Sequence, residues 1–155
     1  MTDTEKLVSV LTEKKMTVST AESCTGGMIS AAITSVPGSS EAFGYGFVTY
    51  ANRAKQRLLG VKGGTLKKFG AVSAQTALEM AVGARLTSGS DYAVSATGIA
   101  GPGGGSEEKP VGLVYIAVAS KKSVVVRENV FSGDRGEIRR QTVEEAIKLL
   151  LSEID

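Results

Sequence analysis

The stretch Thr20-Ala21-Glu22-Ser23-Cys24-Thr25-Gly26-Gly27 decides how the rest of the chain is organised. Residues 16–19 (Met-Thr-Val-Ser), just before it, have the β-branched content of a short strand, and residues 28–33 (Met-Ile-Ser-Ala-Ala-Ile) suit a helix. The stretch is therefore predicted to be a strand-to-helix turn that is rich in hydroxyl groups and glycine. Because a helix N-terminus favours an anion or an oxyanion, we interpret this turn as the active-site turn.

Helical and extended patterns alternate along the remaining chain. We expect helices over residues 3–14, 26–34, 54–59, 65–70, 73–87 and 133–153, and strands over residues 16–19, 43–50, 92–96, 112–119 and 123–131. Right-handed crossovers would make the first three strands parallel, and the last two strands form a hairpin. The predicted fold is a three-layer α/β/α domain of class α/β, with a mixed sheet of about five strands, spanning residues 1–155 as a single domain.

The expected core-facing residues of the helices follow helical spacing. They are Leu7, Val8, Val10 and Leu11 in the first helix, Ala77, Leu78, Ala81 and Ala84 in the helix after Ser73, and Ile138, Thr142, Val143, Ala146, Ile147 and Leu150 in the last. Most of the second group are small, which predicts close packing of that helix on the sheet.

Composition excludes several classes of protein. The chain has 155 residues, is 42% hydrophobic and 22% charged, and carries a net charge of +2, which is ordinary for a globular domain. Aromatic residues make up only 5% and tryptophan is absent, so we expect no nucleic-acid partner. No apolar run approaches the roughly 18 residues of a membrane span, and the N-terminus does not resemble a signal peptide. We therefore expect a cytoplasmic protein with no membrane partner.

The absence of histidine limits the possible chemistry most strongly. With no histidine and a single cysteine, Cys24, the chain can form neither a Ser-His-Asp site, nor a Cys-His site, nor a zinc site built from these residues, nor an intrachain disulfide. A hard-cation site made of carboxylates stays open at this point, but no carboxylate cluster has metal-ligand spacing, so we expect no metal and no cofactor. Any nucleophile must then be activated by lysine, tyrosine or a carboxylate.

Ser23 is the first candidate nucleophile. A lone serine before a helix is more often a simple helix cap, which is the alternative interpretation here. The polar density of the turn and the lack of histidine favour a Ser–Lys arrangement instead. Cys24 is a competing nucleophile, although a single cysteine is more often a small buried apolar residue.

Lys55 is the candidate base, and Tyr50 precedes it at the end of the second strand. Ligands of open α/β sheets bind at the carboxyl ends of parallel strands, which places both residues on the same rim as Ser23. Lysine acts as a base only when burial or a nearby cation lowers its pKa well below about 10.4. The alternative is a solvated helix lysine.

Two further segments are candidate ligand-binding elements. The glycine loop over residues 97–106 (Thr-Gly-Ile-Ala-Gly-Pro-Gly-Gly-Gly-Ser) could bring backbone N–H groups against a phosphate or carbonyl oxygen, or could be only a flexible connection. It matches neither a Walker loop nor a dinucleotide fingerprint. Arg135 and Arg139, near the start of the last helix, could clamp a phosphate or carboxylate, or could be surface charge.

Five ordered motifs together resemble a known family, the C-terminal domain of the competence/damage-inducible protein CinA. The motifs are residues 20–27, Gly46-Phe47-Val48-Thr49-Tyr50 with Asn52 and Lys55, Gly70-Ala71-Val72-Ser73, residues 98–112, and Phe131-Ser132-Gly133-Asp134-Arg135. They extend over nearly the whole chain. They leave no part of it for the molybdopterin-binding-like domain that precedes this module in longer CinA proteins.

The resemblance implies hydrolysis of the carboxamide of nicotinamide mononucleotide (NMN) to nicotinate mononucleotide and ammonia, the nicotinamide-nucleotide amidase (NMN deamidase) reaction of pyridine nucleotide salvage. By the same resemblance Ser23 is the nucleophile, Lys55 its base and Tyr50 an assisting residue. Thr97 and Arg139 match positions that support the substrate or the site. The resemblance also implies a homo-oligomer, with a dimer favoured.

We predict that the turn, the glycine loop and the last helix bind the substrate. The predicted binding residues are Glu22, Cys24, Thr25, Gly26, Gly27, Thr97, Gly98, Gly101, Arg135 and Arg139. Two alternatives stay open at the level of sequence. One is a non-catalytic module that binds a phosphate compound or nucleotide, and the other is an amidase for a different small amide.

Overall fold

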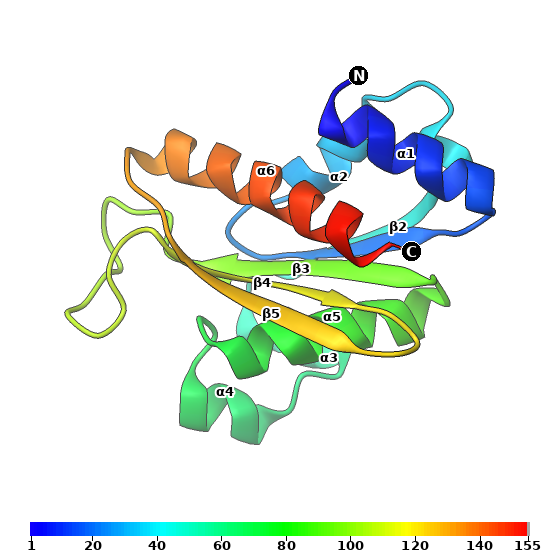
Figure 1. The fold of residues 1–155 in the computed structure, drawn as a ribbon. Helices are drawn as coiled ribbons and strands as arrows, with labels where there is room; N and C mark the ends of the chain where they lie inside the picture. The colour runs from blue at the N-terminus through cyan, green and yellow to red at the C-terminus, as the bar shows by residue number, and fades with distance from the viewer. Residues whose placement is uncertain (155) are drawn as a thin grey trace.

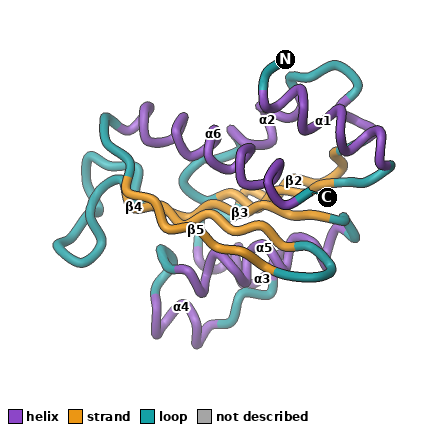
Figure 2. Tube along the Cα trace, in the orientation of Figure 1, coloured by secondary structure: helices purple, strands orange, loops and turns teal. Residues whose placement is uncertain are grey.

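A single mixed sheet forms the centre of the computed structural model, which describes residues 1–154. The strands lie in the order β2-β1-β3-β4-β5 (Figures 1 and 2). They are β1 (Val18–Glu22), β2 (Phe43–Val48), β3 (Tyr92–Gly98), β4 (Leu113–Ala119) and β5 (Val124–Val130). Strands β1, β2 and β3 are parallel, and β4 and β5 are antiparallel to their neighbours, as the crossovers and the hairpin predict.

Helices cover both faces of the sheet (Figure 1). One face carries α1 (Asp3–Lys14), α2 (Met28–Thr34) and α6 (Arg135–Glu153), and the other carries α3 (Asn52–Leu59), α4 (Gly63–Phe69) and α5 (Ala74–Ser88). A short 3-10 turn at Ser39–Glu41 precedes β2. The predicted α/β fold with three layers and five strands is confirmed. Among residues 1–154, no helix combines the length and the apolar character that a membrane crossing requires.

Polar caps begin the longer helices. Thr2 and Glu5 form a capping box at α1, and Asp134 and Glu137 form another at α6, so that each pair satisfies two backbone N–H groups reciprocally. The Ser73 hydroxyl accepts from the Thr76 amide at the start of α5. These local signals explain why helix positions were readable from the sequence.

The two layers of helices pack on the sheet through different residues. The layer of α1, α2 and α6 buries large aliphatic side chains, among them Leu7, Leu11, Ile33, Ile147 and Leu150. The opposite layer is made of smaller clusters in which alanines of α5 lie against the sheet. Ala77, Ala81 and Ala84 are buried as predicted, but Leu78 is 38% exposed, so its assignment to the core-facing side was wrong.

Three elements near the candidate site have bounds that differ from the prediction. Strand β1 runs from Val18 to Glu22 rather than over residues 16–19, because the polar side chains of Thr20 and Glu22 find hydrogen-bond partners in α2 and can be buried within a strand. Strand β2 ends at Val48, before Tyr50, and α2 begins at Met28 rather than at residue 26. The other helices and strands begin and end within two residues of the prediction.

Candidate active site

Ser23 is the first residue after β1, at the carboxyl end of the parallel part of the sheet. Its amide donates to the Ala96 carbonyl at 3.0 Å, which ties the start of the turn to β3. Gly26 and Gly27 follow with backbone φ angles of +56° and +110°, which residues that carry a side chain rarely adopt. The glycines therefore allow the chain to reverse tightly between Ser23 and α2.

Lys55, on α3, is the hydrogen-bond partner of the Ser23 hydroxyl. Its side chain is 1% exposed, and its Nζ atom lies 3.1 Å from Ser23 Oγ. The same Nζ lies 2.9 Å from the Thr49 carbonyl oxygen and 3.1 Å from the Tyr50 carbonyl oxygen. The structure thus brings together two residues that are 32 positions apart in the chain.

Burial lowers the pKa of Lys55 below its usual value, because desolvation disfavours the charged ammonium. The neighbouring Cys24 raises it to a smaller extent. A neutral amine has two N–H groups and one lone pair. It can therefore donate to the carbonyls of Thr49 and Tyr50 while accepting the Ser23 hydroxyl proton, which is the arrangement that a general base needs.

Glu22 holds the turn from the opposite face of β1. Its carboxyl group is fully buried and accepts four hydrogen bonds, from Thr25 Oγ1 at 2.6 Å, the Ile29 amide at 2.8 Å, and the Ser30 amide and hydroxyl at 3.0 and 2.8 Å. Glu22 therefore occupies the first-turn amides of α2 within the chain. The sequence analysis expected the N-terminus of this helix to favour an anion from outside the chain. The Glu22 carboxylate already takes that place, so this expectation was wrong.

Backbone amides of the turn remain available. Among residues 1–154, the amides of Thr25 and Gly27 donate to no other group, whereas the Cys24 amide interacts with its own thiol and the Gly26 amide donates to the Ser23 carbonyl at 3.1 Å. Thr25 is buried and Gly27 half-buried. The turn can thus supply backbone donors next to the candidate nucleophile.

Arg139 supports the same turn from α6. Its guanidinium donates to the Cys24 carbonyl at 3.1 Å and to the Thr25 carbonyl at 3.2 Å. A Cβ atom at Gly26 would lie 3.3 Å from Arg139 Nη2, so a larger residue there would press on this contact. Arg139 therefore fixes the carbonyl groups of Cys24 and Thr25, in the same turn that has amides without a partner.

Cys24 lies beside the pair but is poorly suited to be the nucleophile. Its side chain is buried in the core on the α2 side, and burial is the main reason that its pKa is raised to about 11. Such a thiol is protonated at neutral pH, and the thiolate is the reactive form. The interpretation of Cys24 as a small buried residue is the one that agrees with its surroundings.

Tyr50 is placed differently from the prediction. Its side chain is 62% exposed, and its hydroxyl accepts a hydrogen bond from Arg135 Nη2 at 3.3 Å. Only its backbone carbonyl contacts Lys55. The hydroxyl thus has no hydrogen bond to Ser23 or Lys55 through which a proton could be relayed in this structure.

Arg135 links the Tyr50 side chain to the glycine loop. Its Nη1 donates to the Gly101 carbonyl at 2.9 Å, so one guanidinium joins the loop after β3 to the segment after β2. Both of these partners are neutral, and within residues 1–154 no carboxylate forms an ion pair with Arg135. Figure 1 shows the loop at the same end of the sheet as the start of α6.

Thr97 and Gly98 have structural contacts at the end of β3. The Thr97 hydroxyl donates to the Ala71 carbonyl at 2.8 Å and thereby connects β3 to the segment before α5. A Cβ atom at Gly98 would lie 2.5 Å from Val114 Cγ2 and 2.7 Å from the Leu113 carbonyl oxygen. The glycine is therefore needed where β3 and β4 approach each other.

Sequence reasoning missed Thr49, whose carbonyl is the shortest contact of Lys55. The residue is fully buried directly after β2. No feature of its type or spacing distinguishes it from any other strand-end threonine, and only its position beside Lys55 does so.

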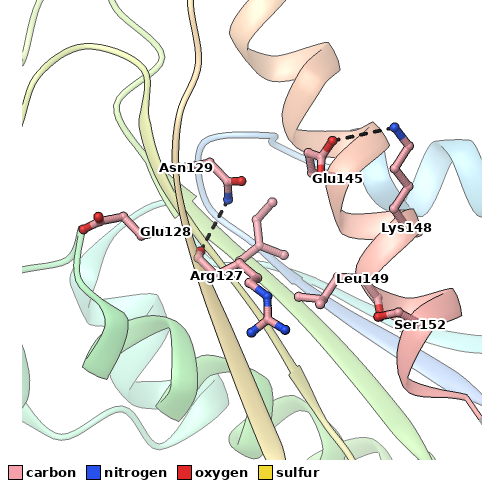
Figure 3. A pocket seen from close by; sticks show the side chains of 8 residues that line it. Arg127, Glu128, Asn129, Glu145, Lys148, Leu149 and Ser152 are labelled. Atoms are coloured by element: carbon pink, nitrogen blue, oxygen red, sulfur yellow. Dashed lines mark hydrogen bonds and ion pairs between the residues drawn. The ribbon is translucent and has the colours of Figure 1, made fainter.

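Other hollows and clusters lie apart from these residues. Figure 3 shows a pocket between β5 and the second half of α6, where Glu145 pairs with Lys148 at 3.7 Å. None of the predicted site residues lines it. In residues 1–154, no group of three or more acidic, cysteine or histidine side chains could hold a metal ion.

A serine next to a buried lysine, at the carboxyl end of a parallel strand, defines the class: an α/β/α protein with a candidate Ser–Lys site. The chain belongs to the CinA C-terminal domain family, whose model matches residues 2–154.

Curated relatives come from several bacteria. A putative competence-damage inducible protein of Caldicellulosiruptor bescii is 56% identical over 150 residues, covering 97% of this chain and 36% of the relative. A CinA-like protein of Endomicrobium trichonymphae is 56% identical over 152 residues, covering 96% and 36%. The chain thus spans about a third of the length of the curated relatives it matches.

Solved structures share the whole fold. The competence/damage-inducible protein CihA from Agrobacterium tumefaciens is 49% identical, with a TM-score of 0.94 and coverage of 98% of this chain and 96% of that chain. A CinA superfamily protein from Escherichia coli is 34% identical, with a TM-score of 0.93 and coverage of 96% and 87%.

Proposed function

We propose that this protein is an amidase that hydrolyses the carboxamide of nicotinamide mononucleotide through a Ser–Lys acyl-enzyme. The observation that carries the proposal is the 3.1 Å contact between Ser23 Oγ and the buried Nζ of Lys55. A module that only binds a ligand has no need of a serine paired with a lysine whose pKa is lowered. Membership of the CinA C-terminal domain family supports the choice of substrate.

Acylation begins when neutral Lys55 takes the hydroxyl proton of Ser23 directly. Ser23 Oγ forms a bond to the amide carbon, and the amide C=O electrons move onto oxygen. The free backbone amides after Ser23 then stabilise that oxyanion, and each such donor is typically worth about 3 kcal/mol. The C–N bond breaks with the proton returned from Lys55, so that ammonia leaves and a nicotinoyl ester of Ser23 remains.

Deacylation uses the same base. Lys55 takes a proton from water, the resulting hydroxide oxygen bonds to the ester carbon, and Ser23 Oγ leaves with that proton. Nicotinate mononucleotide is released and the Ser23 hydroxyl is regenerated, so the atoms balance without any cofactor.

The substrate phosphate fits best at Arg135 in this proposal. Arg135 is exposed, its partners Tyr50 and Gly101 are neutral, and a planar guanidinium suits a phosphate. Arg139 is already engaged with two carbonyls of the turn. We therefore place the nucleotide between Ser23 and the glycine loop, with its phosphate towards Arg135.

Turnover of purified protein tests the function. We expect ammonia and nicotinate mononucleotide from NMN, and loss of at least about 1,000-fold in kcat for Ser23→Ala and for Lys55→Met, each checked for folding by circular dichroism. Ser35→Ala, an exposed serine at the end of α2, is the matched control and should keep full activity. Full activity in Ser23→Ala contradicts the proposal.

A screen separates the alternatives. Tight binding of NMN by calorimetry without turnover would identify a binding module, and ammonia release from other small amides but not from NMN would identify a different amidase.

We also propose, from the family resemblance, that the protein works as a homo-oligomer with a dimer favoured. Light scattering of the purified chain measures that state, and a monomer at the concentration used in the assay contradicts it.

A further inference from the structure

The Thr49 hydroxyl is the one buried side-chain oxygen or nitrogen without a hydrogen-bond partner among residues 1–154. The residue is fully buried. A buried hydroxyl without a partner is destabilising compared with an apolar group of the same shape, and such exceptions in native proteins call for an explanation. Its location beside the proposed base suggests one.

Thr49 lies in the same row of the sheet as Ser23. Val48, Glu22 and Ala96 are aligned across β2, β1 and β3, and the Thr49 amide donates to the Glu22 carbonyl at 2.9 Å, which continues the ladder by one residue. The next row is then Thr49, Ser23 and Thr97, with neighbouring strands about 4.8 Å apart.

The side chains of this row face α3 and α5. Ala21 and Phe47, two residues earlier in their strands, pack in the cluster that contains Leu59 of α3 and Met80 of α5, and side chains two residues apart share a face. Lys55 enters from α3 on this face. In the row, the Thr97 hydroxyl is bound to Ala71 and the Ser23 hydroxyl to Lys55, which leaves only that of Thr49 unused.

Lys55 needs one more acceptor when it is protonated. In the resting enzyme, its two N–H groups match the carbonyls of Thr49 and Tyr50, and its lone pair matches Ser23. After it takes the serine proton, it has three N–H groups, while Ser23 Oγ is bonded to the substrate carbon in the tetrahedral intermediate, where it is a weaker acceptor. The carbonyl oxygen of Thr49 lies 2.9 Å from Lys55 Nζ. The unpaired Thr49 hydroxyl therefore belongs to a residue that already contacts Nζ through its backbone.

We propose that Thr49 is a positioning residue for Lys55, whose hydroxyl accepts the third N–H of the lysine when the lysine is protonated during the reaction. This inference rests on the proposed amidase function. It explains why an unpaired hydroxyl is kept in the free protein, since its partner appears only after proton transfer.

The titratable group that acts on the pKa of Lys55 is the Cys24 thiol. Cys24 itself interacts with Glu22 and Arg139 at the turn, and Tyr50, whose carbonyl contacts Lys55, binds Arg135 through its hydroxyl. In the cluster between α3 and the sheet, α4 and α5 contribute the apolar side chains Leu66, Met80 and Ala84. A change in the titration of Lys55 on removal of the Thr49 hydroxyl can therefore be assigned to that hydroxyl.

Thr49→Val removes the hydroxyl at constant shape, and Thr49→Ser keeps it. We expect Thr49→Val to lower kcat about tenfold or more, because a hydrogen bond to a charged group is lost only after proton transfer. The pKa in the pH profile of kcat should fall, since the charged lysine loses an acceptor, while the pKa in the profile of kcat/KM, which reports the free enzyme, should not move. Thr49→Ser should restore both profiles.

Stability provides a readout independent of turnover. Thr49→Val should leave Tm unchanged or raise it by about 2–4 °C, because no bond of the free protein is lost. Thr76→Val is the matched control, since its buried hydroxyl donates to the Gly70 carbonyl at 2.7 Å, and its Tm should fall. If Thr49→Val fails to fold, Thr49→Ala against Thr49→Ser gives the same comparison of pH profiles.

Wild-type kcat and an unmoved kcat profile in Thr49→Val would overturn the inference, as would a drop of Tm as large as that of Thr76→Val. These failures are distinct from failure of the proposed function. If Ser23→Ala is inactive while Thr49→Val behaves as wild type, only the role of Thr49 is lost. If Ser23→Ala keeps its activity, the Ser–Lys reaction itself is wrong.

Discussion

Two segments leave the carboxyl ends of the neighbouring strands β1 and β3, and they are held in different ways. Two buried or half-buried side chains hold the turn over residues 23–27. The Glu22 carboxylate accepts hydrogen bonds from Thr25 and from the start of α2, and the Arg139 guanidinium donates to the carbonyls of the turn. The segment over residues 99–112, which contains most of the glycine loop, is mostly exposed, and the side-chain contact that reaches it from the last helix is that of Arg135 with Gly101.

For the amidase that we propose, this difference assigns catalysis to the turn and substrate recognition to the segment after β3. Proton transfer tolerates little error in distance, so the nucleophile requires a backbone that is fixed before the substrate arrives. Recognition of the outer part of a nucleotide can be made by exposed groups that adapt to the ligand. We therefore expect substitutions in the turn to affect folding and kcat, and substitutions around the loop to affect mainly KM.

Glu22→Ala should have the largest effect. It leaves the buried amides of Ile29 and Ser30 without an acceptor, and breaking such a buried network costs about 3–5 kcal/mol. For a domain of this size, Tm should fall by roughly 6–15 °C in a thermal melt. Glu41→Ala, an exposed carboxylate, is the control and should melt close to wild type. An unchanged Tm for Glu22→Ala would remove the basis for calling the turn rigid.

Gly98→Ala and Gly103→Ala contrast the tightly packed end of β3 with the open part of the segment that follows it. The new Cβ at position 98 would collide with Val114 and the Leu113 carbonyl, which we expect to destabilise the protein by about 1–3 kcal/mol. At position 103 nothing lies within 4 Å, so the change should stay within about 0.5 kcal/mol. Urea unfolding of both variants measures the difference, and equal midpoints would contradict it.

Arg139→Met should lower kcat about tenfold to a hundredfold with a smaller change in KM, because the carbonyls of Cys24 and Thr25 lose their donors and the turn is less well ordered. Arg139→Lys should recover only part of this loss, since lysine cannot reproduce the two-pronged contact. Steady-state kinetics with NMN gives both constants. A pure KM effect would instead place Arg139 on the substrate.

Arg135→Met should raise KM for NMN about tenfold and change kcat by less than about threefold, because a phosphate contact is lost while the Ser–Lys pair is intact. The dephosphorylated substrate, nicotinamide riboside, supplies the matched comparison. Its kcat/KM should be nearly the same in wild type and in Arg135→Met. Equal losses with both substrates would mean that Arg135 acts through the loop and not through the phosphate.

The smallest effect concerns pH. Only neutral Lys55 can accept the serine proton, so activity should be lost as the pH falls through its pKa, which burial holds below the usual lysine value. Because the pKa of Cys24 is raised to about 11, its thiol should add no second step at lower pH. A pH profile of kcat/KM for wild type tests both statements. A thiol-type step near neutral pH would return Cys24 to consideration.

Much of the fold could be predicted because its signals are local. Thr2, Ser73 and Asp134 mark helix starts by their own hydrogen-bonding chemistry, and the spacing of Ile138, Thr142 and Ala146 marks the buried side of α6. Leu78 was misassigned because Ala77, Met80, Ala81 and Ala84 form the buried side of α5, which leaves Leu78 on the exposed side of the helix. The first strand was misplaced because the sequence suggests that Glu22 is a turn residue, whereas the four hydrogen bonds that its carboxylate accepts allow it to be buried at the end of the strand.

The site was predicted only in part, because local signals do not show which distant residues the fold brings into contact. The lack of histidine pointed to a serine paired with a lysine, and the place of Lys55 after the second strand, together with the family resemblance, pointed to Lys55 as a candidate. The prediction could not say that Tyr50 turns its hydroxyl to Arg135 and offers only its carbonyl to Lys55. Nor could it single out Thr49, whose hydroxyl differs from others only in having no partner.

The sequence by itself determined the order of helices and strands, the absence of histidine chemistry and the identity of the polar turn, because these depend on composition and on neighbours a few residues apart. The tertiary structure alone decided which lysine reaches Ser23, how far that lysine is desolvated, and which amides of the turn stay free. These properties arise from contacts between residues far apart in the chain, and distance and burial exist only once the sheet has brought them together.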